Sequence, residues 1–177
     1  IASLGGFGNV TQNLFVYEYQ DAILVVDCGI GFVEKRAQKT ELIVPDFNYL
    51  IQNKDKIKGL VITHGHEDHM AGLPFLLPKL DKNLPIYASR LAAALIEEKL
   101  GEYGLTNKIN VINSESHLAL GPFSLSFVYV THSIPDTFHI IIRTPVGIIY
   151  HGSDFKFDWP PVMGRQTEVG KMALVGN

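Results

Sequence analysis

The sequence has one cysteine, no long hydrophobic run and no excess of positive charge, and each absence excludes a class of protein. Cys28 alone cannot form an internal disulfide, so we expect a protein of a reducing compartment, the cytoplasm. No apolar run approaches the roughly 20 residues of a membrane-spanning helix, which argues against a membrane partner. The formal net charge of −3 is not the basic footprint of a stand-alone nucleic-acid-binding protein.

What is present favours a folded globular domain. The 177 residues are 46% hydrophobic and 19% charged, which is enough to bury a core without disulfides and too apolar for disorder. No secretory signal is recognisable, and a start at Ile1 leads us to expect a trimmed natural beginning.

Short runs of β-branched and aromatic residues alternate with helical patterns, which predicts packed sheets covered by helices in an α/β fold. The glycine-rich stretch at 4–13 lacks the spacing of a phosphate-binding loop and is expected to be a plain loop, and 28–44 an irregular connection. We predict strands at 14–19, 22–27, 58–63, 85–88, 124–130, 137–143 and 147–151, and helices capped by Asp46, over 70–77, from Ser89 to about Lys99, and over 165–175.

The stretch THGHEDH at 63–69 follows a predicted buried strand and gathers imidazoles and carboxylates. Residues two apart on an extended segment point the same way, so His64 and His66 can bind one ion together. Asp68 and His69 follow where the chain bends into the next helix and can face a second ion. Without a metal, the same loop would bury charged and unpaired groups at a cost of several kcal/mol. The stretch therefore predicts a metal site of the kind zinc prefers.

Further ligands are expected from the ends of other strands. His132 follows the strand at 124–130, and Asp154 follows the strand at 147–151. Strand ends on one edge of a sheet bring loops together at a site. Asp27 closes the strand at 22–27 and is better placed to orient a liganding histidine than to bind metal, although a plain hairpin-end acid is nearly as good an interpretation.

These residues carry a resemblance. THGHEDH matches the HxHxDH signature of the metallo-β-lactamase superfamily, and Asp27, His132 and Asp154 fall in order where the other motifs of that superfamily lie. Over nearly the whole chain, LGGFG, VPDFNYL, KGLVITHGHEDHMAGLP, THSIPD and GSDFKFD resemble the ribonuclease J family of the β-CASP branch.

The resemblance implies an αββα sandwich with two zinc ions at one edge of the sheets. His64, His66 and His132 would hold the first ion, Asp68 and His69 the second, and Asp154 would bridge them. It also implies RNA as the substrate, cut endonucleolytically or from the 5′ end. In the full-length protein it implies a possible homodimer or homotetramer.

The chain departs from the family in its last part. The 23 residues after Asp154 (177 − 154) contain no histidine to complete the shell of the second ion, and the β-CASP domain and the closing segment are absent. We therefore expect residues 1–177 to be the N-terminal part of an incomplete metallo-β-lactamase domain. We also expect the second zinc to bind more weakly.

The leading hypothesis is a zinc-dependent ribonuclease that works through a metal-activated hydroxide. Asp68 would be the catalytic residue that orients the nucleophile or accepts its proton, and Ser133 and Lys156 would contact substrate. Two alternatives remain. One is a hydrolase of a small molecule such as a lactam, thioester or lactone, and the other is a truncated module without catalysis.

Other candidates are given plainer interpretations. Glu67 is expected to be exposed, Cys28 to be a small buried residue, and His117 to lie in a loop. His139 and His151 are expected on strands, near the site at most.

Overall fold

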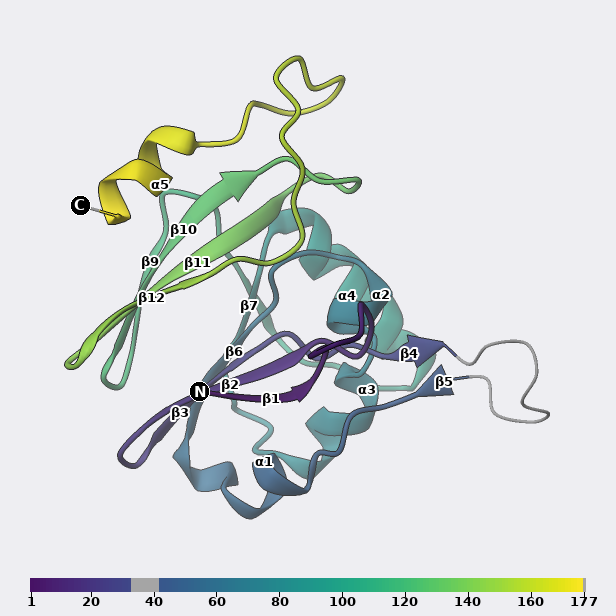
Figure 1. Ribbon diagram of the computed structural model, residues 1–177. Coiled ribbons are helices and arrows are strands. Elements are labelled where there is room, and N and C mark those ends of the chain that lie inside the picture. Colours follow the sequence, from purple (N-terminus) through teal and green to yellow (C-terminus); the bar gives the residue numbers. More distant parts are fainter. Residues whose placement is uncertain (33–41, 177) are drawn as a thin grey trace.

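A computed structural model describes residues 1–32 and 42–176, in which two packed sheets carry helices on their outer faces (Figure 1). Residues 33–41, most of the expected irregular connection, and Asn177 lie outside the described residues.

The first sheet has six strands in the order β1-β2-β3-β6-β7-β8. The first three are antiparallel neighbours, and β3, β6, β7 and β8 run parallel. Every residue of β3 is buried, as expected for a parallel strand that is covered on both faces. The strands are β1 (Ala2–Gly5), β2 (Leu14–Tyr19), β3 (Ala22–Val26), β6 (Ile57–Val61), β7 (Ile86–Ala88) and β8 (Ile109–Val111).

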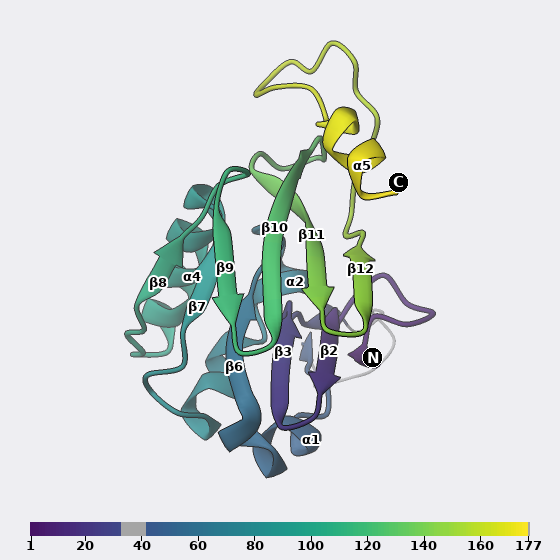
Figure 2. The same cartoon turned by 90° about the vertical axis from the view of Figure 1, so that its left-hand side faces the viewer.

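The second sheet is antiparallel, with the order β12-β11-β10-β9, and Figure 2 shows it in front of the first. Side chains of β10 alternate between its faces: Phe123, Leu125 and Phe127 face the first sheet, whereas Val128 and Val130 contact the last helix. The strands are β9 (His117–Leu120), β10 (Phe123–Val130), β11 (Thr137–Thr144) and β12 (Gly147–His151), and a separate small ribbon pairs β4 (Gly31–Phe32) with β5 (Leu42–Ile43).

The longest helix, α4, begins where the sequence predicts. Ser89 Oγ accepts a hydrogen bond from the backbone nitrogen of Ala92 at 3.3 Å, which satisfies one free donor of the first turn. None of the helices in the described part of the chain is long and apolar enough to cross a bilayer. The helices are α1 (Asn48–Gln52), α2 (Glu67–Met70), α3 (Leu73–Leu76), α4 (Arg90–Glu102) and α5 (Val169–Val175), with 3₁₀ turns η1 (Lys54–Lys56) and η2 (Leu77–Lys79).

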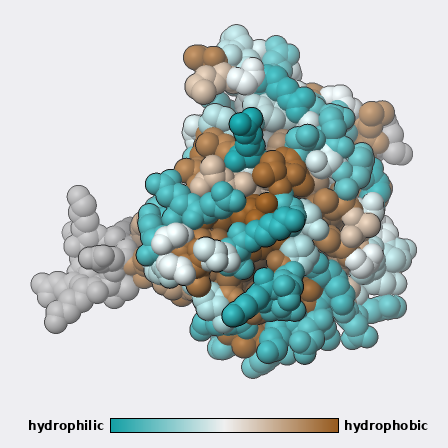
Figure 3. All heavy atoms as spheres, turned by 180° about the vertical axis from the view of Figure 1, so that it is seen from behind, coloured by the Kyte–Doolittle hydropathy of each residue, from teal (hydrophilic) through white to brown (hydrophobic). Residues whose placement is uncertain are grey.

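Two apolar cores hold the layers together. One lies between the first sheet and α1, α3 and α4, and the second fills the space between the two sheets. A small third cluster joins α5 to the outer face of the second sheet. The expected sandwich of two sheets between helices is therefore confirmed. Figure 3 shows the face opposite to Figure 1, where hydrophobic residues gather near the centre among hydrophilic ones.

The helices differ from prediction where glycine and proline intervene. The helix expected over 70–77 is broken into α2, α3 and η2, because Gly72 packs against the backbone of Cys28 and Pro74 has no N–H to continue the ladder. Asp46 lies one residue before the N-cap of α1, although its Oδ1 accepts from the nitrogen of Asn48 at 2.9 Å. The last helix starts at Val169, not at 165.

Five short strands were not predicted, and two of them, β4 and β5, pair within the segment at 28–44 that was expected to be an irregular connection. β1 occupies the start of the expected glycine-rich loop, and β8 and β9 have three and four residues, too few for a period-2 pattern to be recognised. The expectation that His117 lies in a loop is wrong, because it begins β9.

Candidate metal centre

The loop that carries the three clustered histidines, residues 63–69, leaves the first sheet at the point where the two sheets meet. β6 ends at Val61, whose carbonyl oxygen accepts from the nitrogen of Asp27 at 2.9 Å. Two residues later the carbonyl of Thr63 accepts from the nitrogen of Phe138, in the second sheet, at 3.0 Å. The loop is therefore tied to both sheets immediately before His64.

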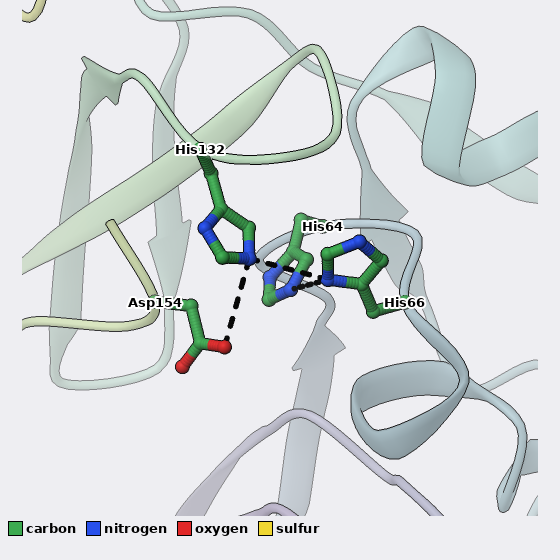
Figure 4. Close-up of side chains that lie close together, drawn as sticks. All are labelled: His64, His66, His132 and Asp154. Atoms are coloured by element: carbon green, nitrogen blue, oxygen red, sulfur yellow. Dashed lines mark hydrogen bonds and ion pairs between the residues drawn. The ribbon is translucent and has the colours of Figure 1, made fainter. Parts of the chain in front are cut away.

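Four predicted ligands lie together in this loop region: His64, His66, His132 and Asp154 (Figure 4). His66 Nδ1 is 3.0 Å from His64 Nε2 and 3.2 Å from His132 Nε2. Asp154 Oδ2 is 3.6 Å from His132 Nε2. Two ligand atoms at 2.0–2.1 Å from a tetrahedral zinc ion lie about 3.3 Å apart, so these spacings fit one shared ion.

A second group consists of Asp68, His69 and Asp154. His69 Nε2 is 3.6 Å from Asp68 Oδ2 and 3.7 Å from Asp154 Oδ2. The same oxygen of Asp154 therefore belongs to both groups, which is the arrangement of a bridging carboxylate. The structure brings together all six residues predicted as ligands, from three separate parts of the chain.

Asp27 lies beneath this site and is completely buried. Its Oδ2 accepts from His69 Nδ1 at 2.8 Å, and its Oδ1 accepts from the nitrogen of Thr63 at 2.8 Å. Burial raises the pKa of Asp27, but the His69 imidazole overcomes this and holds that pKa below its usual value. Asp27 thus contacts the Nδ1 side of His69, and Nε2 of the same ring lies on the side of the second group.

Thr63 connects Asp27 to His64, a role that the sequence did not reveal. Its hydroxyl lies 2.9 Å from Asp27 Oδ2 and 3.0 Å from His64 Nδ1. A carboxylate only accepts, so the hydroxyl donates to Asp27 and accepts from His64 Nδ1–H. This arrangement leaves the lone pair of His64 Nε2 directed at the first group.

The charges around the site favour a bound cation. Burial lowers the pKa of His64 to about 3, and the contact with His69 lowers that of Asp154 to about 2, so both present free lone pairs at neutral pH. Burial opposes a charge on His69, but Asp27 and Asp154 raise its pKa to about 10. The carboxylates around His69 thus create a pocket that stabilises positive charge, which is what a bound metal ion supplies.

Asn13 is a second contact that sequence reasoning missed. Its side-chain nitrogen is 3.0 Å from His69 Nε2 and 3.4 Å from Asp68 Oδ2, although 55 or more residues separate them in sequence. No local pattern signals such a contact, because Asn13 sits in a loop that carries no ligand.

Two glycines allow the loop that carries Asp68 and His69 to lie against the end of β3. A Cβ atom at Gly29 would overlap the backbone oxygen of Asp68, and one at Gly72 would lie 2.8 Å from the carbonyl oxygen of Cys28. Cys28 N donates to the carbonyl of His69 at 2.7 Å across this contact. Cys28 itself is buried, as expected for a small apolar residue.

The two candidate substrate contacts line a cavity of about 200 Å³ beside His132. Ser133 and Lys156 are both exposed, and Lys156 Nζ forms an ion pair with Asp158 Oδ2 at 3.1 Å. Tyr129, Pro161 and Val162 supply apolar walls. The cavity therefore combines the Lys156–Asp158 ion pair with apolar surface next to the first group of ligands.

The remaining candidates behave largely as expected. Glu67 is exposed and forms an ion pair with Lys99 Nζ at 3.3 Å. His139 and His151 lie on β11 and β12 and contact tyrosines rather than either group of ligands: His139 Nδ1 is 2.9 Å from the hydroxyl of Tyr150, and His151 Nδ1 is 2.6 Å from that of Tyr17.

Comparisons with known proteins identify the family of the chain. A family model described as the beta-lactamase superfamily domain matches residues 23–174. Among curated proteins, the chain is 44% identical over 178 residues to ribonuclease J 1 of Streptococcus pyogenes and 40% identical over 183 residues to ribonuclease J of Thermus thermophilus. Each match covers 99% of this chain but only 31% and 32% of the relative, so the chain spans about a third of their length.

Solved structures show the same fold at low identity. The metallo-beta-lactamase fold protein YhfI of Bacillus subtilis aligns with a TM-score of 0.53 at 20% identity, over 79% of this chain and 53% of that one. The Rm3 metallo-beta-lactamase aligns with a TM-score of 0.56 at 16% identity, over 79% and 54%. At this identity the likeness supports the fold alone.

Proposed function

This chain belongs to the beta-lactamase superfamily, and from that premise we propose that it is the metal-binding portion of a zinc-dependent ribonuclease that hydrolyses RNA phosphodiester bonds. One observation carries the proposal. A single oxygen, Asp154 Oδ2, lies 3.6 Å from His132 Nε2 and 3.7 Å from His69 Nε2, so it can bridge two ions. The similarity to ribonucleases J supports RNA as the substrate class.

The donor set suits zinc. Three imidazole nitrogens and a carboxylate oxygen form the first group, and such ligands match a borderline cation better than a hard one. Within the described residues, the second group offers only Asp68, His69 and Asp154. A tetrahedral ion needs a fourth ligand, so we propose that the second ion binds more weakly in this chain.

Two bound zinc ions would supply an activated water at neutral pH and stabilise charge on a phosphoryl oxygen. The chain's own groups prepare the site for this chemistry. Asp27 and Thr63 fix the orientation of His69 and His64, and Asp68 is assigned to orient the attacking water or accept its proton. The side chain of Asp68 is 22% exposed, which leaves it accessible to solvent for proton transfer.

We assign the cavity beside His132 to the substrate strand. Lys156 can pair with a phosphate, Ser133 can donate a hydrogen bond to it, and the apolar walls suit a base or ribose. Exonuclease and endonuclease action both belong to the proposal. Assembly as a homodimer or homotetramer of the full-length protein and a cytoplasmic location belong to it as well.

The test compares three substrates with one zinc-loaded preparation: 5′-labelled single-stranded RNA, a phosphodiester chromogen and a β-lactam chromogen. We expect slow cleavage of RNA and no cleavage of the lactam. Asp68→Ala and His66→Ala should each abolish RNA cleavage while the fold survives.

Glu67→Ala is the matched control, because Glu67 lies between these two residues in sequence and its side chain is exposed. It should retain full activity. Equal RNA cleavage by wild type and Asp68→Ala at saturating zinc would refute the proposed mechanism. Cleavage of the lactam alone would favour a small-molecule hydrolase.

A further inference from the structure

Asn13 ends the glycine-rich loop before β2, and its side chain reaches the second group of ligands. The residue is 8% exposed. Its amide nitrogen lies 3.0 Å from His69 Nε2, 3.4 Å from Asp68 Oδ2, and 3.2 Å from the carbonyl oxygens of both Asp68 and Val10. We propose that Asn13 is a positioning residue that holds the ligands of the second ion in place and thereby sets its affinity, an inference that rests on the two-ion centre proposed above.

Hydrogen-bond chemistry fixes the direction of these contacts. An amide NH₂ group only donates, and it has two hydrogens for four acceptors. His69 Nδ1 donates to Asp27, so in the neutral ring, the form that binds a metal ion, Nε2 carries the lone pair and accepts from Asn13. The amide thus draws the two ligand atoms, Asp68 Oδ2 and His69 Nε2, toward one point.

The Asn13 amide has more acceptors within reach than hydrogens. It can therefore give up its hydrogen bonds to His69 and Asp68 when an ion binds to them. An ion at the second group takes the lone pairs of His69 Nε2 and Asp68 Oδ2. The amide then keeps two hydrogen bonds, to the carbonyls of Val10 and Asp68, each already 3.2 Å away. No buried donor is left without a partner, so the exchange creates no unsatisfied polar group at the site.

The backbone of Asn13 is also hydrogen-bonded to the segment that carries Asp68 and to the segment that follows β3. Its nitrogen donates to the carbonyl of Asp68 at 2.9 Å, and its carbonyl accepts from the nitrogen of Gly29 at 2.9 Å. Gly6 adopts a positive φ of 83°, and a Cβ atom there would lie 2.5 Å from Asn13 Oδ1. The glycine-rich loop, which lacks a phosphate-binding pattern, therefore makes room for the Asn13 side chain.

The experiment titrates the chain with Zn²⁺ by calorimetry and with Co²⁺ by visible absorption, without RNA. Wild type should bind two ions per chain in two resolved steps. Asn13→Ala should weaken the second step by about 10- to 100-fold and leave the first within about twofold. Asn13→Asp should restore or exceed wild-type affinity at the second step, because a carboxylate oxygen then stands in ligand distance of the ion, with a changed Co²⁺ spectrum.

Asn9→Ala is the matched control, because Asn9 lies in the same loop and contacts only Thr11 among the described side-chain bonds. It should bind both ions as wild type does. If wild type binds in two steps and Asn13→Ala leaves both affinities unchanged, or weakens both equally, the role of Asn13 is overturned and the proposed function stays intact. A single step in wild type would overturn the two-ion centre together with this inference.

Discussion

His69 donates from Nδ1 to Oδ2 of Asp27 at 2.8 Å, and both side chains are shielded from solvent, with 2% and 0% exposed. Histidine carries its metal-binding lone pair on whichever nitrogen does not hold the proton. The buried carboxylate therefore decides which nitrogen of His69 faces the second group of ligands.

Asp27→Asn should weaken binding of the second ion. An amide removes the negative charge that fixes the proton on Nδ1, and loss of such a partner usually costs 10- to 100-fold in metal affinity. Zinc titration calorimetry measures the change. Asp21→Asn, at a 95% exposed side chain, is the control and should have no effect. Unaltered affinity in Asp27→Asn would show that Asp27 is a plain structural acid.

Removal of metal should lower the melting temperature. An ion that binds only the native state at 100 times its Kd adds about 2.7 kcal/mol, which corresponds to roughly 5–10 °C for a domain of this size. Differential scanning calorimetry with excess zinc and with a chelator gives the difference. In His66→Ala most of this shift should disappear. A chelator without effect on wild type would argue against any tightly bound ion.

Gly29→Ala should destabilise the fold, whereas Gly101→Ala should stabilise it. The new methyl at position 29 overlaps the backbone of Asp68, and overpacking of this kind costs about 1–3 kcal/mol. Gly101 lies inside α4 with no atom near its added methyl, so alanine there gains about 0.5–1 kcal/mol. Urea denaturation of both variants tests the pair. Equal stability of the two variants would contradict the tight backbone contact.

Lys156→Ala should raise the KM for RNA without changing metal content. Its ammonium group borders the cavity beside His132 and can neutralise one phosphate, whereas it contacts none of the ligands. Elemental analysis and initial rates separate the two effects, and Lys54→Ala, in η1 away from the site, serves as control. A fall in zinc content together with the rate would assign Lys156 a structural role instead.

His139 should make stability depend on pH. It is buried with no hydrogen-bond partner for Nε2 among the described residues, and burial lowers its pKa to about 4 from the usual 6.5. Between these values the unfolded chain binds more protons than the native one. The stability is therefore complete above pH 6.5 and falls as the pH drops toward 4, by up to about 3 kcal/mol.

His139→Leu removes this dependence. Between pH 7.5 and pH 4.5, the unfolding free energy of wild type should therefore fall more than that of the variant. Chelator is present throughout, so that metal binding does not contribute to the difference. Parallel curves over this range would show that His139 does not stay neutral in the native state.

The sequence predicted the centre of the site because its ligands carry their own chemistry. Three histidines and two carboxylates within seven residues are rarely placed together unless they bind metal, and His132 and Asp154 stand at the ends of strands whose patterns are strong. The rule that loops at one sheet edge meet accounts for His132 and Asp154, which both follow strands of the second sheet. The loop at 63–69 follows a strand of the first sheet and reaches them because the two sheets pack together.

Contacts made by ordinary side chains could not be predicted. Thr63 and Asn13 form hydrogen bonds to residues as far as 90 and 56 positions away in the sequence, and neither differs locally from a residue without a role. β8 and β9 were missed because strands of three or four residues are defined by their pairing partners. The break after α2 depends on a close backbone approach at Gly72 that only the folded chain contains.

The hydrogen bond from Phe138 N to the Thr63 carbonyl joins the two layers one residue before His64 and six residues after His132. Because His64 follows a strand of the first sheet and His132 a strand of the second, any shear or hinge between the layers changes the separation of their imidazoles. The absorption spectrum of a Co²⁺ ion bound between them would then report relative movement of the two sheets, including movement caused by substitutions far from either histidine.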